Sequence, residues 1–455
     1  MCPLKALILA AGEGRRLKES AAKGKIYFPK PLTPLLGLSL LERTILNLRE
    51  NGIEEIFIVT GYQGEKIKRF IKDGSRYGVK VSYIDNDQWT KGNGSSVLAA
   101  ERTLKKESSF LLIMADHVMQ PGAVKKLLES DEQVKPGEVY VLVDYKCQKV
   151  FRIEEATKVL VDSDGRILDI GKDIKDYNAV DCGVFLCTSG IFQALSDEAL
   201  EGRHALSDGI RRLAKNGMVK GVDIGEEWWI DVDDKWDLEE ARKRLLESLR
   251  SPRDGLISKL INRRLSIPIS GLVASTRVTP NMISFLNFLV ACLSAAAFIK
   301  GLWPVGGLLA QSAAVIDGVD GEIARLKYMA TKYGAYFDSI LDRYGDALII
   351  FGMTLGWYLA HSEVFIWLLG SAALIGSPMS MLGKEKFHAL TGNPYYPEKY
   401  DGFLRYVPAN RDGRLFLIML GSIFGQLPLV LGILAVITNV LAFGRLVMVR
   451  KVLCR

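Results

Sequence analysis

The feature of the sequence that most constrains its fold is a change in apolar pattern between residues 255 and 279. Before this point the apolar runs are short and charged residues lie among them. After it, apolar stretches of about 20 residues follow one another, and each is long enough to cross the hydrocarbon core of a bilayer. A chain of 455 residues is also too long for one ordinary domain. The sequence therefore predicts a soluble half followed by a membrane-spanning half.

The first half alternates short β-rich runs with helical patterns. This alternation is typical of an α/β, Rossmann-like fold with a mainly parallel sheet and helices on both faces. Such sheets bind ligands at the carboxyl ends of their strands, where a glycine loop and Asp116 fall. The strands are predicted at 5–12, 54–62, 80–85, 109–116 and 138–145, and the helices at 39–51, 64–73 and 94–106.

The second half predicts an all-α domain of six transmembrane helices. Lys and Arg residues crowd at alternate flanks of its apolar segments, which places both termini in the cytosol by the positive-inside rule. We expect a multi-pass protein of the plasma membrane. The segments lie near 280–299, 302–324, 334–360, 363–383, 413–426 and 428–448.

The predicted domain division is a soluble domain over 1–250, an amphipathic juxtamembrane linker over 251–278 and a membrane domain over 279–455. Residues 256–265 of the linker are basic and amphipathic, which fits a helix on the membrane surface or a solvated linker helix. The formal net charge of +7 arises mainly beside the apolar segments, so we expect a lipid bilayer as partner and no nucleic acid. The six cysteines show no CxxC pair, as expected of reduced thiols facing the cytosol.

Four aspartates lie at the inner ends of the second and third apolar segments. Asp317 and Asp320 are three residues apart, and Asp338 and Asp342 are four apart, so each pair shares one helical face. Carboxylates at this depth are costly unless they are paired, hydrated or bound to cations. Oxygen ligands without His or Cys suit Mg²⁺, Ca²⁺ or Mn²⁺. We therefore predict a divalent metal site, with Gly321 leaving room for a phosphorylated ligand.

The string D-x2-D-G-x2-A-R-x8-G-x3-D-x3-D resembles the signature of the CDP-alcohol phosphotransferases, a family of six-helix membrane enzymes. The resemblance implies that Asp317, Asp320 and Asp338 bind metal ions. It also implies that Asp342 is the general base, with a further role as metal ligand left open. The acceptor hydroxyl would attack the β-phosphorus of a CDP-alcohol and release CMP. The matching residues are Asp317, Asp320, Gly321, Ala324, Arg325, Gly334, Asp338 and Asp342.

The same resemblance assigns Gly321, Arg325 and Asn281 to the nucleotide, although the segment 279–281 is equally well explained as a helix N-cap. Arg325 is one turn from the acids and could also balance their charge, and Asp346 is expected to have a supporting role. The basic loop 384–414 either follows from the positive-inside rule or forms a pocket for an anionic acceptor. Substrate-phosphate ligands expected there are Lys384, Arg405 and Arg411, with Arg263 and Arg264 as further candidates.

The first half resembles the nucleotidyltransferases that couple a nucleoside triphosphate to a sugar or polyol phosphate. The family pattern is G-x-G-T-R followed by P-K-P-L, and this chain departs from it at Arg15, where threonine is usual. Arg16 and Lys30 would act catalytically by neutralising charge on the α-phosphate. Pattern residues present are Gly12, Gly14, Arg16, Pro29, Lys30, Pro31 and Leu32.

Other roles in the first half follow from the same resemblance. Asp116 would bind Mg²⁺ with Asp231 or Asp233, of which we favour Asp231. His117 is expected to be structural, and Lys158 either contacts the substrate phosphate or is simply exposed. The loop 92–95 either binds the base or is a plain surface turn. Nucleotide binding is expected of Gly12, Gly14, Arg15, Asn93, Gly94 and Ser95.

Joined, the two halves resemble the bifunctional inositol-1-phosphate cytidylyltransferase and di-myo-inositol phosphate phosphate synthase family of heat-loving microbes. That resemblance implies CTP, inositol 1-phosphate and CDP-inositol as substrates, with Mg²⁺ or Mn²⁺ in both domains. It leaves open a homodimer formed through the membrane domain. The alternatives are a phospholipid synthase with a lipid acceptor, a regulatory nucleotide-binding first half, and a six-span transporter. The position of the acids at one membrane face speaks against the transporter.

Overall fold

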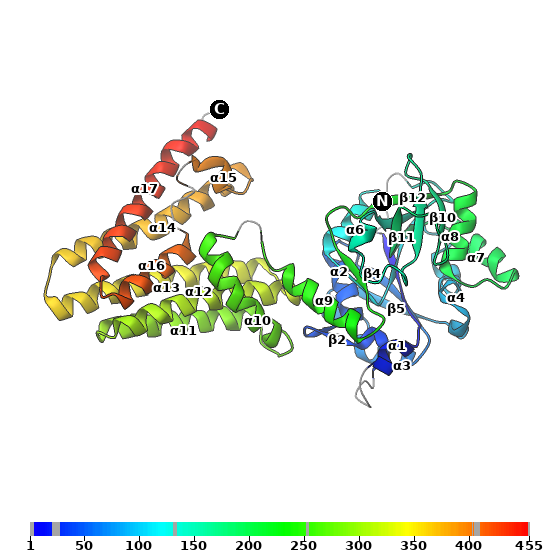
Figure 1. The fold of residues 1–455 in the computed structure, drawn as a ribbon, viewed down its shortest axis with the longest axis horizontal. Coiled ribbons are helices and arrows are strands. Elements are labelled where there is room, and N and C mark those ends of the chain that lie inside the picture. Colours follow the sequence, from blue (N-terminus) through cyan, green and yellow to red (C-terminus); the bar gives the residue numbers. More distant parts are fainter. Residues whose placement is uncertain are drawn as a thin grey trace. The chain divides into compact units, whose positions relative to one another are not determined.

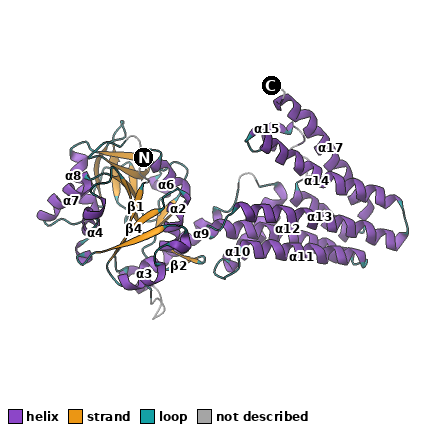
Figure 2. Ribbon diagram, turned by 180° about the vertical axis from the view of Figure 1, so that it is seen from behind, coloured by secondary structure: helices purple, strands orange, loops and turns teal. Residues whose placement is uncertain are grey.

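The computed structural model describes residues 4–20, 28–130, 134–251, 254–402, 404 and 410–453. The chain divides into two compact units, Met1–Arg244 and Leu245–Arg455. The first unit contains both strands and helices, and the second is helical (Figures 1 and 2). An α/β unit followed by an all-α unit is therefore confirmed.

The first unit is built around a nine-stranded mixed sheet in the order β10-β9-β11-β6-β1-β4-β5, with β8 paired to β11 and β12 paired to β8. The strands β5, β4, β1 and β6 are parallel, whereas β11 pairs antiparallel to β6, β8 and β9. The strands are β1 (Lys5–Ala10), β2 (Pro34–Leu35), β3 (Leu38–Ser39), β4 (Glu55–Thr60), β5 (Lys80–Asp85), β6 (Phe110–Met114), β7 (His117–Met119), β8 (Val139–Asp144), β9 (Lys158–Val161), β10 (Ile167–Gly171), β11 (Ala179–Cys187), β12 (Val219–Asp223) and β13 (Trp229–Asp231).

Helices cover the sheet as predicted. Helices α4, α7 and α8 pack together beside the sheet (Figure 1). The core cluster that includes residues of these helices also contains Leu7, Leu9 and Phe57 of the sheet. The predicted helices 39–51 and 64–73 are α2 and α3, but 94–106 is interrupted at Ala100 and forms α4 and α5. The helices are α1 (Arg15–Ser20), α2 (Leu40–Glu50), α3 (Gly64–Ile71), α4 (Asn93–Ala99), α5 (Glu101–Leu104), α6 (Pro121–Leu128), α7 (Gly190–Leu200), α8 (Leu206–Lys215) and α9 (Lys235–Glu247).

The five predicted strands are present as β1, β4, β5, β6 and β8, each shortened by a residue or more except β5. The run β9 to β13 was not predicted. Its strands are short or carry charged residues, such as Asp169 in β10 and Asp181 in β11, so their apolar alternation is weak. The antiparallel part of the sheet is therefore visible only in the structure.

Among the described residues of the second unit, a helix lies at the position of each of the six apolar segments. Helix α11 packs against both α12 and α13, and α14 packs against α17. Where α13 crosses α11, a Cβ on Gly356 would collide with the Phe298 carbonyl oxygen, so glycine permits the close approach. The helices are α10 (Arg263–Val273), α11 (Pro280–Ile299), α12 (Trp303–Leu326), α13 (Lys332–His361), α14 (Phe365–Thr391), α15 (Pro397–Tyr400), α16 (Arg411–Ile423) and α17 (Leu427–Leu453).

Three of these helices are long and apolar enough to cross a membrane: Pro280–Ile299, Phe365–Thr391 and the stretch Leu427–Arg450. Their outer surfaces expose large apolar side chains such as Leu286, Leu289 and Leu293, as expected of a surface that faces lipid. Helix α16 has 13 residues, about 20 Å, which is short for a complete span. Membrane association therefore rests on three helices, and six spans remain a prediction.

Candidate active sites

The first candidate site lies where the loops after β1, β6 and β13 meet. The Lys30 ammonium is 2.5 Å from Asp116 Oδ2, 2.6 Å from Asp233 Oδ1 and 3.9 Å from Asp231 Oδ1. Lys30 is nearly buried, at the start of a short 3-10 turn, Lys30–Leu32. Burial alone would lower the pKa of Lys30, but Asp116, Asp231 and Asp233 together raise it. The lysine is therefore held as a fixed positive charge among carboxylates.

The β7–β13 ladder brings two of the predicted metal ligands together. Asp231 pairs in register with His117, directly after Asp116. Ligand atoms of Asp116, His117 and Asp231 all lie within 4.8 Å of one another. Within the described part of the chain, Asp231 Oδ1 is buried and has no hydrogen-bond partner. A buried carboxylate oxygen of this kind fits a divalent cation.

Asp233 differs from Asp231 in its ion-pair partners. It is bound by two cations, since Arg16 Nη2 lies 2.7 Å from Asp233 Oδ2 while Lys30 donates to Asp233 Oδ1. Asp231 makes no such close ion pair among the described residues, and burial raises its pKa to about 6. This difference favours Asp231 over Asp233 as the second metal ligand.

His117 is held in place as a packing residue. Its ring stacks on Trp229 with centroids 5.7 Å apart, and Nδ1 lies 3.0 Å from Asp116 Oδ1. Gly183, with φ of +73°, lies under the ring, where a Cβ would approach to 2.5 Å. Burial lowers the pKa of His117, but Asp231 and Asp116 outweigh this and raise it to about 9. The ring thus orients Asp116.

The glycine loop approaches Lys30 closely. Gly14 has φ of +65°, and a Cβ there would lie 2.5 Å from Lys30 Cβ, so both conformation and space require glycine. Arg16 faces Asp233 and also pairs with Glu155. Arg15 instead points to Glu13, 2.5 Å away, and its side chain is largely exposed. The arginine at position 15, where threonine is usual, therefore does not disturb the contacts of Arg16 and Lys30.

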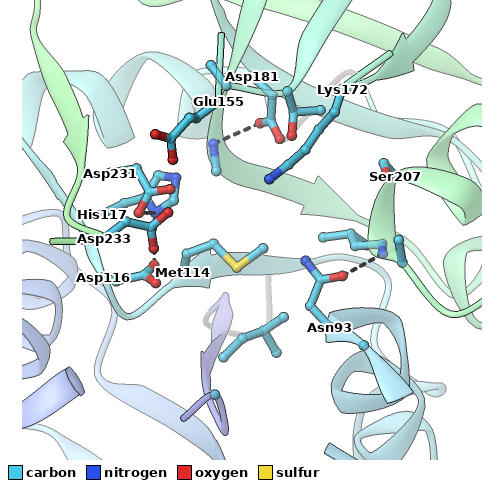
Figure 3. A pocket seen from close by; sticks show the side chains of 18 of the residues that line it. Asn93, Met114, Asp116, His117, Glu155, Lys172, Asp181, Ser207, Asp231 and Asp233 are labelled. Carbon is cyan, nitrogen blue, oxygen red and sulfur yellow. Dashed lines mark hydrogen bonds and ion pairs between the residues drawn. The ribbon is translucent and has the colours of Figure 1, made fainter. Parts of the chain in front are cut away.

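A cavity of about 740 Å³ opens over this loop. Gly12, Arg15 and Arg16 line one end, and Gly92 and Asn93 line another wall. Figure 3 shows Asn93 on the side of the cavity opposite Asp116, with its carbonyl oxygen accepting from the Leu206 N–H at 2.7 Å. The predicted base-binding loop therefore contributes Gly92 and Asn93 to the cavity wall.

Gly94 and Ser95 of that loop do not line the cavity. A Cβ on Gly94 would meet the His204 carbonyl oxygen at 2.6 Å, and Ser95 donates to the carbonyls of Gln88 and Gly92. Their roles are to close the turn and permit tight packing behind it. Their predicted contact with the nucleotide stays a prediction.

The lysine that enters the cavity is Lys172, which the sequence did not identify. Figure 3 shows its side chain directed into the cavity on the side of Asp181 and Glu155. Lys158, the predicted phosphate ligand, is not among the lining residues and donates to the Lys172 carbonyl oxygen at 2.9 Å. Lys172 directly follows β10, and recognition of that strand would have placed it at a strand end.

The second candidate site is formed by α12 and α13. Ligand oxygens of Asp317, Asp338 and Asp342 lie within 4.8 Å of one another. Asp320 lies beside them and accepts a hydrogen bond from Ser284 at 2.5 Å. Asp338 Oδ1 is buried without a hydrogen-bond partner in the described ranges. The predicted convergence of four carboxylates is present, and the three grouped acids fit a divalent cation.

Arg411 supplies the positive charge of this acidic cluster. Its Nη1 lies 2.5 Å from Asp317 and 2.9 Å from Asp342, and its Nε lies 3.0 Å from Asp346. Arg414 binds Asp346 from the other side at 2.6 Å. The structure thus places Arg411 among the acids of the predicted metal site rather than in a separate acceptor pocket. Asp346 supports the cluster by fixing both arginines.

The remaining predicted residues of this half fall as follows. Arg325 lies beside Gly321, where a Cβ would be 3.4 Å from its Nη1, and Asn281 Oδ1 would be 3.2 Å from a Cβ on Gly334. The N-cap alternative for 279–281 is also present, because Thr279 Oγ1 accepts from the Met282 N–H. Lys384 lies on α14, and Arg405 lies outside the described residues.

A cationic residue near the end of α17 was not predicted. Arg445 is buried and binds Asp401 through Nε at 3.0 Å and Nη2 at 2.6 Å. Tyr395 donates to the same carboxylate at 2.5 Å. This cluster connects the segment after α14 to α17. The sequence around Arg445 is apolar, so it did not predict an ion pair there.

Comparisons with known proteins match both units. Residues 6–149 match the MobA-like NTP transferase domain, and residues 277–448 match the CDP-alcohol phosphatidyltransferase family. A bifunctional IPC transferase and DIPP synthase of Rubrobacter xylanophilus is 34% identical over 92% of this chain and 90% of that protein. The protein of the same name from Aquifex aeolicus is 34% identical over 95% of both chains. The inositol-1-phosphate CTP transferase structure from T. maritima has 25% identity and a TM-score of 0.46, covering 54% of this chain and 96% of that chain.

Proposed function

The chain belongs to the family of bifunctional IPC transferases and DIPP synthases, and from this membership we propose that its two units catalyse successive steps. The first unit joins CTP to inositol 1-phosphate, giving CDP-inositol and pyrophosphate. The second joins CDP-inositol to another inositol 1-phosphate, giving a phosphorylated di-inositol phosphodiester and CMP. The observation that carries this proposal is the presence of two separate carboxylate clusters, Asp116 with Asp231 and Asp317 with Asp338 and Asp342.

In the first step a phosphate oxygen of inositol 1-phosphate attacks the α-phosphorus of CTP, and pyrophosphate leaves. The backbone at Gly12 and Gly14 approaches the triphosphate, while Arg16 and Lys30 stabilise the charge that develops on the α-phosphate. Asp116 and Asp231 would hold Mg²⁺ or Mn²⁺, which neutralises the phosphate charge when bound.

In the second step an inositol hydroxyl attacks the β-phosphorus of CDP-inositol, and CMP leaves. Asp342 accepts the hydroxyl proton as general base, and Arg411 keeps the acids together. Asp317, Asp320 and Asp338 would hold the divalent cation that neutralises the pyrophosphate charge of CDP-inositol. Lys384 is a proposed ligand of the acceptor phosphate, and Gly321, Arg325 and Asn281 are proposed ligands of the nucleotide.

We further propose that the chain is a multi-pass protein of the plasma membrane with six spans and both termini in the cytosol. The alternating basic flanks and the outward apolar side chains of α11 support this topology. The proposed division is 1–250, 251–278 and 279–455. A homodimer through the membrane unit stays a prediction.

The proposal is tested with the purified full chain, CTP, inositol 1-phosphate and Mg²⁺, followed by phosphorus NMR. We expect pyrophosphate, CMP and a new water-soluble phosphodiester. Adding EDTA should stop both steps, because each site groups acids suited to a divalent cation. CDP-inositol accumulating without CMP would point to a lipid acceptor, and CMP release in EDTA would contradict the second metal site.

Alanine substitutions of Lys172 and Lys158 test which of the two lysines binds the phosphate of inositol 1-phosphate in the first cavity. Lys172→Ala should raise the KM for inositol 1-phosphate by about 10-fold or more, because a charge-assisted phosphate contact is lost. Lys158→Ala should change this KM by less than about 2-fold, because the Lys172 ammonium that faces the phosphate is retained. Initial rates of pyrophosphate release measure both. The reverse ranking would restore Lys158 as the ligand.

A further inference from the structure

Glu322 is a fully buried carboxylate on α12 that the proposed chemistry does not use. It lies two residues after Asp320, inside the signature but at one of its variable positions. Its oxygens accept hydrogen bonds from Arg263 Nη1, Ser266 Oγ and Ser270 Oγ, each at 2.6 Å. A buried charge is tolerated only with such complete pairing. Glu322 therefore forms a fully hydrogen-bonded contact between α12 and another element.

That element is the juxtamembrane segment before the first apolar helix. Arg263, Ser266 and Ser270 are three and four residues apart, so they lie on one face of α10. On α12, Gly318 lies one turn before Glu322, and a Cβ there would be 3.2 Å from Arg263 Nη1 and 3.3 Å from Ser266 Oγ. The missing side chain lets α10 lie directly against α12.

The segment is also fixed at its start. Asp254 binds Arg263 through both carboxylate oxygens, at 3.1 and 3.2 Å, so the guanidinium is held between two acids. Asn262 bridges two helices: it accepts from Gln311 of α12 at 2.7 Å and donates to Asp412 of α16 at 3.0 Å. Asp412 directly follows Arg411, the arginine of the acidic cluster.

The contact lies on the side of α12 that faces away from the metal site. With 3.6 residues per turn, the direction of Gly318 and Glu322 differs from that of Asp317 and Asp320 by about 150°. The juxtamembrane segment thus supports α12 from behind the acids. A sliding or rotation of α12 against α10 would move Asp317 and Asp320 together.

We propose that the segment from Asp254 to Val273 is a working part of the phosphotransferase site, and that Glu322 is its positioning residue. Through Glu322 it fixes the rotation of α12, and through Asn262 and Asp412 it fixes the start of α16, where Arg411 lies. This inference rests on the proposed function of the second unit. The matched family region begins at residue 277, after this segment. In this proposal residues 256–265, predicted as a surface or linker helix, and Arg263, predicted as a further phosphate-ligand candidate, have a packing role.

The test uses the full chain, supplied with CDP-inositol and inositol 1-phosphate so that the second step is measured alone. Glu322→Gln keeps the shape but removes the charge, and should lower kcat for CMP release by about 10- to 100-fold, because misplacement of reacting groups is costly. Glu322→Asp should restore part of this loss. The KM for inositol 1-phosphate should stay within about 2-fold, because the acceptor contacts are unchanged.

Two serines give a matched control. Ser270 and Ser294 are both fully buried, and each donates one hydrogen bond, to Glu322 at 2.6 Å and to the Gly306 carbonyl at 2.7 Å respectively. Ser270→Ala should slow CMP release several-fold and Ser294→Ala should leave it unchanged, although both remove a buried bond. Equal effects of the two would show general stabilisation and overturn the proposal.

A readout independent of turnover is Mn²⁺ binding by EPR, in a background where Asp116→Asn and Asp231→Asn remove the first site. Glu322→Gln should weaken Mn²⁺ binding by about 10-fold and speed hydrogen exchange in α10. Unchanged Mn²⁺ affinity with unchanged CMP release would overturn the positioning role. If the unsubstituted chain released no CMP, the proposed function itself would fail, whereas the Mn²⁺ and exchange results would still test the contact.

Discussion

Asp342→Asn should reduce CMP release by about 1000-fold while pyrophosphate release continues at the rate of the unsubstituted chain, because a positioned general base contributes about 10²- to 10⁴-fold. Asparagine keeps the shape of the side chain and can retain the contact with Asn287. It cannot take the proton of the attacking hydroxyl. The first unit is untouched by the change, so the first step serves as the internal control.

The effect should be large because Asp342 belongs to the acidic cluster in two ways. It belongs with Asp317 and Asp338 to the group of carboxylates proposed to hold a divalent cation, and it pairs with Arg411 at 2.9 Å. Loss of its charge weakens both interactions. Asp317→Asn separates the two roles, since it keeps the base and should be partly rescued by raised Mg²⁺. Rescue of Asp342→Asn by Mg²⁺ alone would assign Asp342 to the metal, and equal loss of both steps would refute the division of labour.

The measurement is release of CMP and pyrophosphate from one sample by phosphorus NMR, with CDP-inositol added in a parallel sample. With the proposed sequence of steps, Asp342→Asn should accumulate CDP-inositol from CTP and inositol 1-phosphate. Continued formation of the phosphodiester would remove Asp342 from the base role. Such accumulation would also show directly that the first unit works without the second.

The second site could be predicted to a large extent because its geometry is local. The spacing of Asp317 and Asp320, and of Asp338 and Asp342, fixes their helical faces without any knowledge of the tertiary fold. Arg411 lies about 70 residues further along the chain, where it could equally belong to the basic loop. Its place among the acids follows from packing of α16 against α12, which no periodicity encodes.

Long-range pairing explains the other differences. Lys158 and Lys172 are both lysines at the edges of strands, and only the β9–β10 pairing shows that Lys172 enters the cavity while Lys158 lies outside. Asp231 and Asp233 are two residues apart, so alternation puts them on one face and leaves the choice open. The β7–β13 ladder pairs Asp231 with His117, the residue after Asp116, and ends before Asp233, which the sequence does not show. Glu322 gave no signal because its partners lie more than 50 residues earlier.

Lys30→Ala should have the opposite effect to Asp342→Asn. Pyrophosphate release should fall by at least about 100-fold, because removing one preorganised group from a developing phosphate charge costs about 10²- to 10³-fold. The same protein should still convert added CDP-inositol and inositol 1-phosphate to CMP. The physical reason is the position of Lys30, buried and within 2.6 Å of both Asp116 and Asp233, where its charge cannot be replaced by water or by a neighbouring lysine.

Lys18 is the matched control for this change. It lies near the same loop, but its ammonium is 3.5 Å from Glu13 and 3.8 Å from the Tyr62 ring centroid, and it does not line the cavity. Lys18→Ala should therefore leave pyrophosphate release within about 2-fold, as expected for a surface substitution. Lys30→Met, which keeps more of the side-chain volume, should be as inactive as Lys30→Ala if the charge is what matters. Normal CDP-inositol formation in either Lys30 variant would remove Lys30 from its catalytic role. Loss of CMP release as well would mean that the two units do not work independently.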